Sequence, residues 1–438
     1  MTTLTQLAEA MQALLTTKAD ELARSCGFVR RTRKVTGANF AQAVVFTALA
    51  DSEATESRLH ATAAAVGLNA SRQAIDKRFD ARGAAFLREL LAAAVVEAIG
   101  SSVAIPLLRR FTAVTVLDSS IVALADELAD LYRGGRSGTT TGAKAAVKLT
   151  VGLDLKSGVL HGPELGDGRA ADLRSALAEA APPGGGLQLA DLNYFSLTKF
   201  ARWQASGAFW LSRFKAGTAV YDAQGRRVDL LARLQAAGGA DVDLDVGLGS
   251  QQRLAGRLIA RRVPAEVAAI RRKRLLDKGE RRGNRVSALS LALCEWTALV
   301  TNVPRAALEV EEALALTRVR WQIELIFKLW KSRGGIDEFR SAKPLAALCE
   351  MYGKLLAQVV RHWVIVVGAW SRRDRSLTKA AEIVRTLALS LAMAIRSIDR
   401  LRGVLRHARQ MMVVAARMEK RRSSPNAHDV IFCLDPGP

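Results

Sequence analysis

Cysteine and histidine are scarce in this chain of 438 residues, which has four cysteines and five histidines. The cysteines are Cys26, Cys294, Cys349 and Cys433, and their spacing fits neither a disulfide framework nor a zinc site. The histidines are scattered and form no ligand cluster along the chain. We therefore expect a reducing cytosol, and any metal ion must be held by oxygen ligands.

Long apolar runs are also missing. The longest candidate, Trp363 to Trp370, is far shorter than the ~20 apolar residues that a bilayer span needs. The first fifteen residues, MTTLTQLAEAMQALL, lack a basic start and predict an amphipathic helix rather than a secretory signal. The sequence thus predicts a soluble, cytoplasmic chain without a membrane partner.

Acidic residues are few relative to basic ones, with 42 Asp and Glu against 64 Lys and Arg. The resulting net charge of +22 predicts a polyanionic partner, with nucleic acid the first candidate and a membrane surface the rival. Arginine outnumbers lysine, which favours bidentate contacts to phosphate.

Periodicity predicts an α/β protein whose mixed sheet is flanked by helical regions. We expect a helical N-terminal DNA-binding region at 1–105 and a catalytic core at 106–217 and 290–345. Between the two core segments, 218–289 predicts a β-rich basic insertion. Residues 346–438 predict a helical C-terminal region with a possible role in dimerisation.

The N-terminal region contains a candidate helix-turn-helix. A short helix is predicted to end at Gly67, and a second helix to begin at Ser71 as its N-cap. The second helix would enter a major groove, although any helical hairpin with a glycine turn has the same pattern. Its outer side is predicted to carry the DNA-binding residues Arg72, Gln73, Lys77 and Arg78.

Two aspartates each follow an apolar strand directly. The strand in FTAVTVLDSS breaks at Asp118, and the strand in LQLAD runs into Asp191. Either residue alone is most often a turn former or helix cap. Together they are less ordinary, because functional groups gather at the carboxyl ends of strands in open α/β sheets.

The insertion contains the densest basic stretch, Arg271 to Arg285. It is either a solvated loop or a patch that binds a nucleic-acid backbone.

A third acidic residue lies on a predicted helix from Thr317 to Lys331 that packs against the sheet. At about 100° per residue, one face of roughly 80° holds Glu324 among cations, while most of the remaining circumference is apolar. The alternative is a solvated stripe of i,i+4 ion pairs. The residues on the polar face are Thr317, Arg320, Glu324, Lys328 and Lys331.

Three carboxylates in a strongly basic protein suit two-metal phosphoryl transfer, which needs no histidine and no protein nucleophile. The segment RWQIELIFKLWK, with Arg320, Glu324 and Lys331 at the spacing R-x3-E-x6-K, resembles the signature helix of the IS4-type insertion-sequence transposases in the DDE superfamily. The similarity extends to LDSS at Asp118 and LADLNYF at Asp191.

The resemblance implies an RNase H-like core in which Asp118, Asp191 and Glu324 are catalytic and ligate two Mg²⁺ ions, with Mn²⁺ as a substitute. Arg320, Lys331 and Lys328 would then hold DNA phosphates. Trp296 and Trp321 are further DNA-binding candidates because either could stack on an unpaired base, although both are equally typical of a core.

The resemblance also implies the partners and the setting. The protein would bind double-stranded DNA at terminal inverted repeats, cleave there, and join the end to target DNA as a homodimer in a synaptic complex. A bacterial, nucleoid-associated location follows. Two residues depart from the family pattern, because Thr317 stands in place of a tyrosine and Asn193 in place of a glycine that precedes Tyr194.

Two alternatives remain open. A catalytically inactive, transposase-derived protein would bind DNA without cutting it, and the altered Thr317 keeps this alternative open. A general RNase H-like nuclease would cut DNA without regard to end sequence, but the long helical N-terminus and the insertion are superfluous for that activity.

Overall fold

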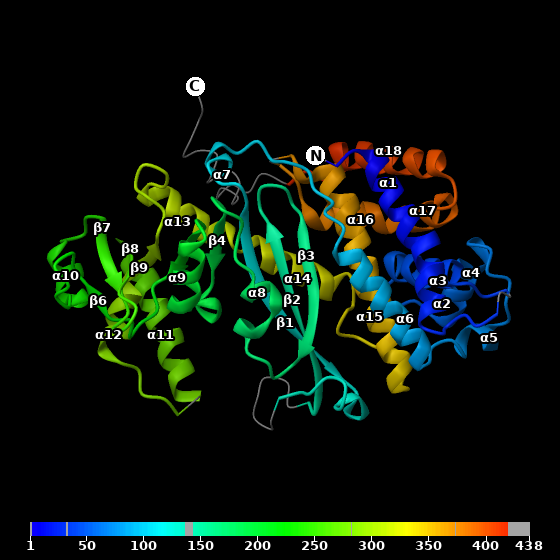
Figure 1. Cartoon of the computed structure of the whole chain (residues 1–438), viewed down its shortest axis with the longest axis horizontal. Helices are drawn as coiled ribbons and strands as arrows, with labels where there is room; N and C mark the ends of the chain where they lie inside the picture. Colours follow the sequence, from blue (N-terminus) through cyan, green and yellow to red (C-terminus); the bar gives the residue numbers. More distant parts are fainter. Residues whose placement is uncertain (1, 32–33, 136–142, 282, 373, 419–438) are drawn as a thin grey trace. The chain divides into compact units, whose positions relative to one another are not determined.

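The computed structural model describes residues 2–31, 34–135, 143–281, 283–372 and 374–418 (Figure 1). Cys433 lies outside these ranges. Contacts divide the chain into two compact units. Unit 1 draws its described residues from 1–104, 118–171 and 322–424, and unit 2 draws its own from 105–117 and 172–321.

Unit 1 is largely helical, as the sequence predicts for both ends of the chain. Its central helix, α15, begins at Pro344, whose fixed φ suits the first helical turn, and packs against α3 and α6. The N-terminal helices are α1 (Leu4–Ala13), η1 (Leu14–Lys18), α2 (Ala19–Ser25), α3 (Gly37–Ala50), α4 (Glu56–Ala65), α5 (Arg72–Asp76) and α6 (Ala81–Val95). Those that follow are η2 (Asp126–Leu128), α14 (Gln322–Ser332), α15 (Pro344–Ile365), η6 (Val366–Trp370), α16 (Leu377–Thr386), α17 (Ala388–Ala394) and α18 (Ile398–Ala415).

The helix that passes through Trp363 is buried on nearly every side over its second half. Such a helix belongs to a protein core. No helix within the described ranges is both long and apolar enough to span a bilayer.

The strands form one mixed sheet in the order β3-β2-β1-β4-β5-β9-β8-β7-β6, with β1 divided between the units after Leu117. β1, β4 and β5 pair in parallel, whereas β2 with β3 and the strands from β9 to β6 pair antiparallel. The strands are β1 (Val114–Leu124), β2 (Ala145–Asp154), β3 (Leu160–Asp167), β4 (Leu187–Ala190), β5 (Phe209–Arg213), β6 (Val220–Tyr221), β7 (Val242–Leu248), β8 (Leu254–Arg262) and β9 (Trp296–Thr301).

Unit 2 surrounds its strands with short helices and one long one. They are α7 (Pro106–Arg109), η3 (Asp172–Arg174), α8 (Ala176–Glu179), η4 (Leu192–Tyr194), α9 (Leu197–Ala205), α10 (Leu230–Ala236), α11 (Ala265–Arg281), α12 (Ala288–Ala292), η5 (Leu293–Glu295) and α13 (Val310–Val319).

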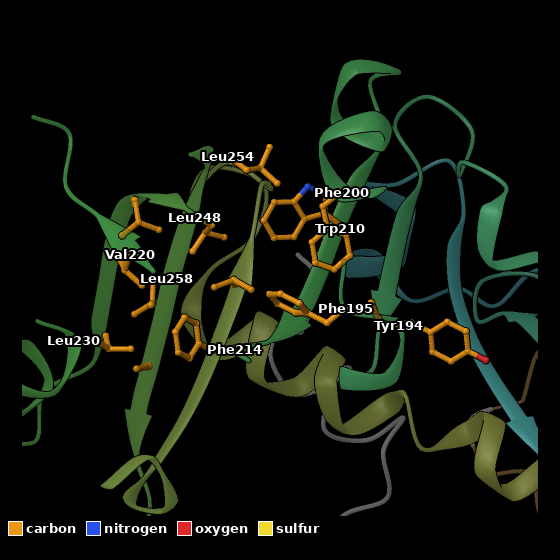
Figure 2. Close-up of a cluster of buried hydrophobic side chains, with 14 of the residues drawn as sticks. Tyr194, Phe195, Phe200, Trp210, Phe214, Val220, Leu230, Leu248, Leu254 and Leu258 are labelled. Carbon is orange, nitrogen blue, oxygen red and sulfur yellow. The ribbon is translucent and has the colours of Figure 1, made fainter. Parts of the chain in front are cut away.

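An aromatic layer forms the core of unit 2. The rings of Phe200 on α9 and Trp210 on β5 stack with their centroids 4.7 Å apart and their planes only 6° from parallel. Figure 2 shows them side by side, with Phe195 and Phe214 among the surrounding apolar side chains. This core fixes the backbone on either side of Asp191, which lies between β4 and α9.

The structure adds two features to the predicted insertion. Its strands β7 and β8 do form, but they continue the main sheet through β9. The basic stretch from Arg271 is mostly helix α11, so of its two alternatives the solvated loop is wrong, and a patch that binds a nucleic-acid backbone stays a prediction. The helix is consistent with the local composition, because Ala, Arg, Leu, Lys and Glu all have high helix propensity.

Candidate active site

Asp118 lies within β1 rather than at its end. The strand continues to Leu124, so the predicted break at Asp118 is wrong. The residues after the two serines, Ile121 and Val122, are β-branched and favour extended backbone. The Asp118 side chain is partly exposed, and its Oδ1 accepts a hydrogen bond of 2.9 Å from the backbone N–H of Ser119.

Asp191 follows β4 directly, as predicted. Its backbone is extended, with φ −77° and ψ 168°, and it caps the short helix η4. Its carbonyl oxygen accepts a 2.9 Å hydrogen bond from the N–H of Tyr194, while its carboxylate-bearing side chain is partly exposed. Asn193 lies within η4 and has no positive φ, so the glycine-like turn implied at this position is not required.

The predicted continuous helix from Thr317 to Lys331 is interrupted. α13 ends at Val319, Arg320 and Trp321 form a turn, and α14 begins at Gln322. Thr317 therefore lies on α13 in unit 2, and Glu324 on α14 in unit 1. The Thr317 hydroxyl donates a 2.7 Å hydrogen bond to the carbonyl oxygen of Ala313, so the helix itself occupies it.

α14 packs against β2, which confirms that Glu324 lies on a helix against the sheet. Glu324 is partly exposed in the first turn of this helix. Lys328, one turn later, is exposed, and Lys331 makes a 3.7 Å ion pair with Asp337. Asp337 was not among the predicted residues, and the sequence carries no evident signal for it because a Gly-Gly turn separates it from the helix.

All three predicted metal ligands offer carboxylate oxygens, the donors that Mg²⁺ prefers, and all three are partly exposed. The residues thus suit the ion in chemistry and accessibility. Within the described ranges, however, no three or more His, Cys, Asp and Glu side chains are gathered closely enough to hold a metal ion.

The two candidate tryptophans have opposite environments. Trp296 opens β9 and is only 7% exposed within the apolar cluster of unit 2, which fits the core alternative. Trp321 in the turn before α14 is 51% exposed. Only Trp321 therefore offers an open ring face for stacking on a base.

The candidate helix-turn-helix is present, with a short second helix. Gly67 ends α4 with φ +79°, and the Ser71 side chain caps α5 by accepting from the N–H of Ala74. α5 has only five residues. Gln73 and Lys77 are exposed, whereas exposed Arg72 is ion-paired with Glu56.

Arg78 does not lie on the outer side of that helix, contrary to prediction. It follows the end of α5 and is partly buried, with Nη1 donating a 2.8 Å hydrogen bond to the Phe28 carbonyl oxygen. Its guanidinium also lies over the Phe28 ring, 5.3 Å from the centroid. These contacts indicate a structural role.

Comparison with known proteins identifies a family over the part of the chain that contains Asp118, Asp191 and Glu324. A family model described as a transposase DDE domain matches residues 109–360, more than half of the chain. The protein therefore belongs to the DDE transposases, and the predicted RNase H-like α/β core is confirmed. This family acts on DNA.

Individual proteins similar to this chain include transposases of insertion sequences, which confirms the resemblance drawn from the sequence. The transposase for insertion sequence element IS231F of Bacillus thuringiensis subsp. israelensis is 28% identical over 380 residues, covering 80% of this chain and 77% of its own. That of IS231C of B. thuringiensis subsp. berliner is 29% identical, covering 77% and 75%. That of IS1151 of Clostridium perfringens is 23% identical, covering 79% and 77%.

Proposed function

We propose that this transposase cleaves the ends of its insertion sequence and joins them to target DNA by two-metal-ion phosphoryl transfer. In this proposal Asp118, Asp191 and Glu324 are the catalytic metal ligands. The ions, Mg²⁺ with Mn²⁺ as a substitute, would when bound stabilise the negative charge on the transferring phosphoryl group.

The register between β1 and β4 is the observation that supports this proposal most directly. Val116 of β1 pairs in parallel with Leu189 of β4. Asp118 and Asp191 each come two residues after their member of that pair. Because side chains alternate along a strand, an offset of two keeps each aspartate on the same side as the paired residue before it.

Three cations near Glu324 in sequence would hold DNA phosphates. Lys328 is exposed for such a contact, and Lys331 would exchange its long ion pair with Asp337 for phosphate. An exposed ion pair contributes about 0 to 1 kcal/mol, so the exchange costs little. Arg320, in the turn between the helices, would add a planar guanidinium suited to two phosphate oxygens. The exposed ring of Trp321 would stack on an unpaired base.

The binding partners would be the terminal inverted repeats and a target duplex. Two copies of the protein would engage two ends in a synaptic complex, in the cytoplasm of a bacterium at the nucleoid. Gln73 and Lys77, both exposed on and after α5, are the remaining candidates for contacts to the repeat, with Arg72 available if its ion pair with Glu56 opens.

A nicking assay tests this function. The purified protein would be incubated with Mg²⁺ and a supercoiled plasmid carrying the inverted repeats that flank the reading frame. We expect nicks at the repeat ends, and loss of nicking by about 10³-fold or more in Asp118→Asn, because the carboxylate charge that holds the ions is removed.

The same assay separates the alternatives. Binding to the repeats without any nicking would indicate a catalytically inactive DNA-binding protein. Equal nicking of a plasmid without the repeats would indicate a general nuclease. Either result contradicts the proposal.

A further inference from the structure

The turn that follows α14, residues 333–338, continues directly from that helix, and we call it the exit turn. The N–H of Gly335 donates to the Lys331 carbonyl oxygen at 3.0 Å, and that of Ile336 to the Trp330 carbonyl oxygen at 3.4 Å. Gly335 has a φ of +50°, in the left-handed region that glycine adopts at low cost. The side chains of Trp330 and Ile336 are buried. The exit turn is therefore tied to the last turn of α14.

The exit turn lies against α15. A Cβ atom on Gly334 would collide with the Trp330 carbonyl oxygen and with the side chain of Gln358 on α15. Glycine lets the two backbones approach this closely because it has no side chain. Gln358 is itself buried, and its Oε1 accepts a 2.7 Å hydrogen bond from Arg361. The α15 side of this contact is thus held by its own core.

Lys354 of α15 binds the exit turn from inside that core. Its ammonium donates to the carbonyl oxygens of Gly335 at 3.1 Å and Glu338 at 2.6 Å, which takes two of its three N–H donors. Lys354 is only 6% exposed, so its charge is largely desolvated. A methionine of similar length would fill this space without that cost. The distinctive contribution of the lysine is therefore to hold two carbonyl oxygens of the exit turn in place.

The two anchored carbonyl groups lie on either side of Asp337 in the chain. The carboxylate of Asp337 is 3.7 Å from Nζ of Lys331. The two side chains are 35% and 38% exposed, so an incoming phosphate can reach the ammonium. A lysine side chain that is already held loses less conformational freedom when it binds a ligand. The contacts from Lys354 through Asp337 thus prepare Lys331 for phosphate.

We propose that Lys354 is a positioning residue for binding of the transposon end. It fixes the exit turn so that Asp337 holds the ammonium of Lys331 in place for a DNA phosphate. Lys354 itself, buried on α15, contacts no DNA and takes no part in cleavage. This role rests on the proposed function, in which Lys331 exchanges its ion pair with Asp337 for that phosphate.

A double-mutant cycle on DNA affinity tests this role. Fluorescence anisotropy without divalent ions would measure the Kd for a duplex that ends at the cleaved repeat. We expect Lys354→Met to raise this Kd by about 3- to 10-fold, the range for ordering one long side chain. In a Lys331→Gln background the same change should raise Kd by less than about twofold, because the effect passes through Lys331. An Asp337→Asn background should give the same small rise, because Asp337 connects the exit turn to Lys331.

His362→Met is the matched control. His362 is equally buried on α15, but its ring Nε2 lies 2.8 Å from the carbonyl oxygen of Gly158 in another part of unit 1. This change should lower the melting temperature and leave Kd unchanged within about twofold. If Lys354→Met does not fold, Lys354→Gln retains an amide donor for one carbonyl oxygen. It should raise Kd by about threefold, with no such rise in the Lys331→Gln background.

Three results would overturn the proposal. They are an unchanged Kd in Lys354→Met, a rise of the same size in either background, or an equal rise in His362→Met. An unchanged Kd in Lys331→Gln alone would contradict the phosphate contact of Lys331 in the proposed function and, with it, the role of Lys354. Absence of nicking by the unaltered protein would contradict the proposed function while leaving the comparison of Kd values intact.

Discussion

Helices α15 and α18 of unit 1 carry the same kinds of basic residue in opposite environments. On α15, Lys354, Arg361 and His362 are at most 6% exposed, whereas three of the four arginines of α18 are exposed. The basic residues of the chain therefore do not all lie on its surface. Some of them stabilise a core, and others are available to a polyanion.

The cations of α15 bind main-chain carbonyls from distant segments. Lys354 Nζ donates to the carbonyl oxygens of Gly335 and Glu338, at 3.1 and 2.6 Å. Arg361 donates to the Leu49 carbonyl oxygen at 3.0 Å and to Oε1 of Gln358 at 2.7 Å. Burial lowers the pKa of Lys354 below its usual value and that of Arg361 to about 10, so Arg361 remains charged at neutral pH.

The largest difference between the two helices should appear in stability. Arg361→Ala should lower the free energy of unfolding by about 3 to 5 kcal/mol, because it leaves a cavity and two unsatisfied acceptors. Arg406→Ala, its exposed counterpart on α18, should change it by no more than about 0.5 kcal/mol. Urea denaturation followed by circular dichroism measures the free energy of unfolding of both variants. Equal losses in the two variants would contradict the difference between the helices.

The next largest difference concerns pH. His362 is buried and its ring Nε2 lies 2.8 Å from the Gly158 carbonyl oxygen, so we assign the proton to Nε2. Burial lowers the pKa of His362 from 6.5 to about 4. The unfolded chain therefore binds more protons between about pH 4 and 6.5, and stability should fall by up to about 3 kcal/mol as pH decreases through that range.

Two substitutions separate this contribution from other titrations. His362→Gln retains a donor for the Gly158 carbonyl oxygen and should flatten the change in stability between pH 6.5 and 4. His407→Gln on the exposed side of α18 should leave that change as it is. Thermal melts across this pH range measure both, and an unchanged profile in His362→Gln would refute the assignment.

A smaller difference is expected between the exposed Trp321 and the buried Trp296. Trp321→Ala should weaken binding of cleaved-end DNA by about 1 to 3 kcal/mol if a base stacks there, with little change in stability. Trp296→Ala should instead destabilise the fold, because its ring is buried in the core of unit 2. A loss of stability in Trp321→Ala equal to that in Trp296→Ala would show that both rings are structural.

Local sequence predicted those features that local chemistry determines. The turn at Gly67, the cap at Ser71, and the strand that precedes Asp191 all have their signals within a few residues. The hairpin of β2 and β3 turns at Lys156 to Gly158, where Gly158 has the positive φ of 71° that glycine adopts readily.

Other features depend on distant contacts or on competing signals. The turn at Arg320 and Trp321 contains neither glycine nor proline, so the polar stripe from Thr317 to Lys331 predicted an unbroken helix. The partners of Arg361 and His362 come from segments far away in the chain. The arginines of α18 are visible in the sequence, but which side of that helix is buried depends on its contacts with α1, α16, α17 and η6.

Metal rescue tests most directly whether the three carboxylates hold the catalytic ions. Asp118, Asp191 and Glu324 would each be replaced by cysteine, and nicking at the repeat ends would be compared in Mg²⁺ and Mn²⁺. Thiolate is a poor ligand for Mg²⁺ and a better one for Mn²⁺. We predict that each variant loses nicking in Mg²⁺ by about 10³-fold and regains part of it in Mn²⁺. Undiminished nicking in Mg²⁺ by any one variant would contradict the assignment of that residue as a ligand.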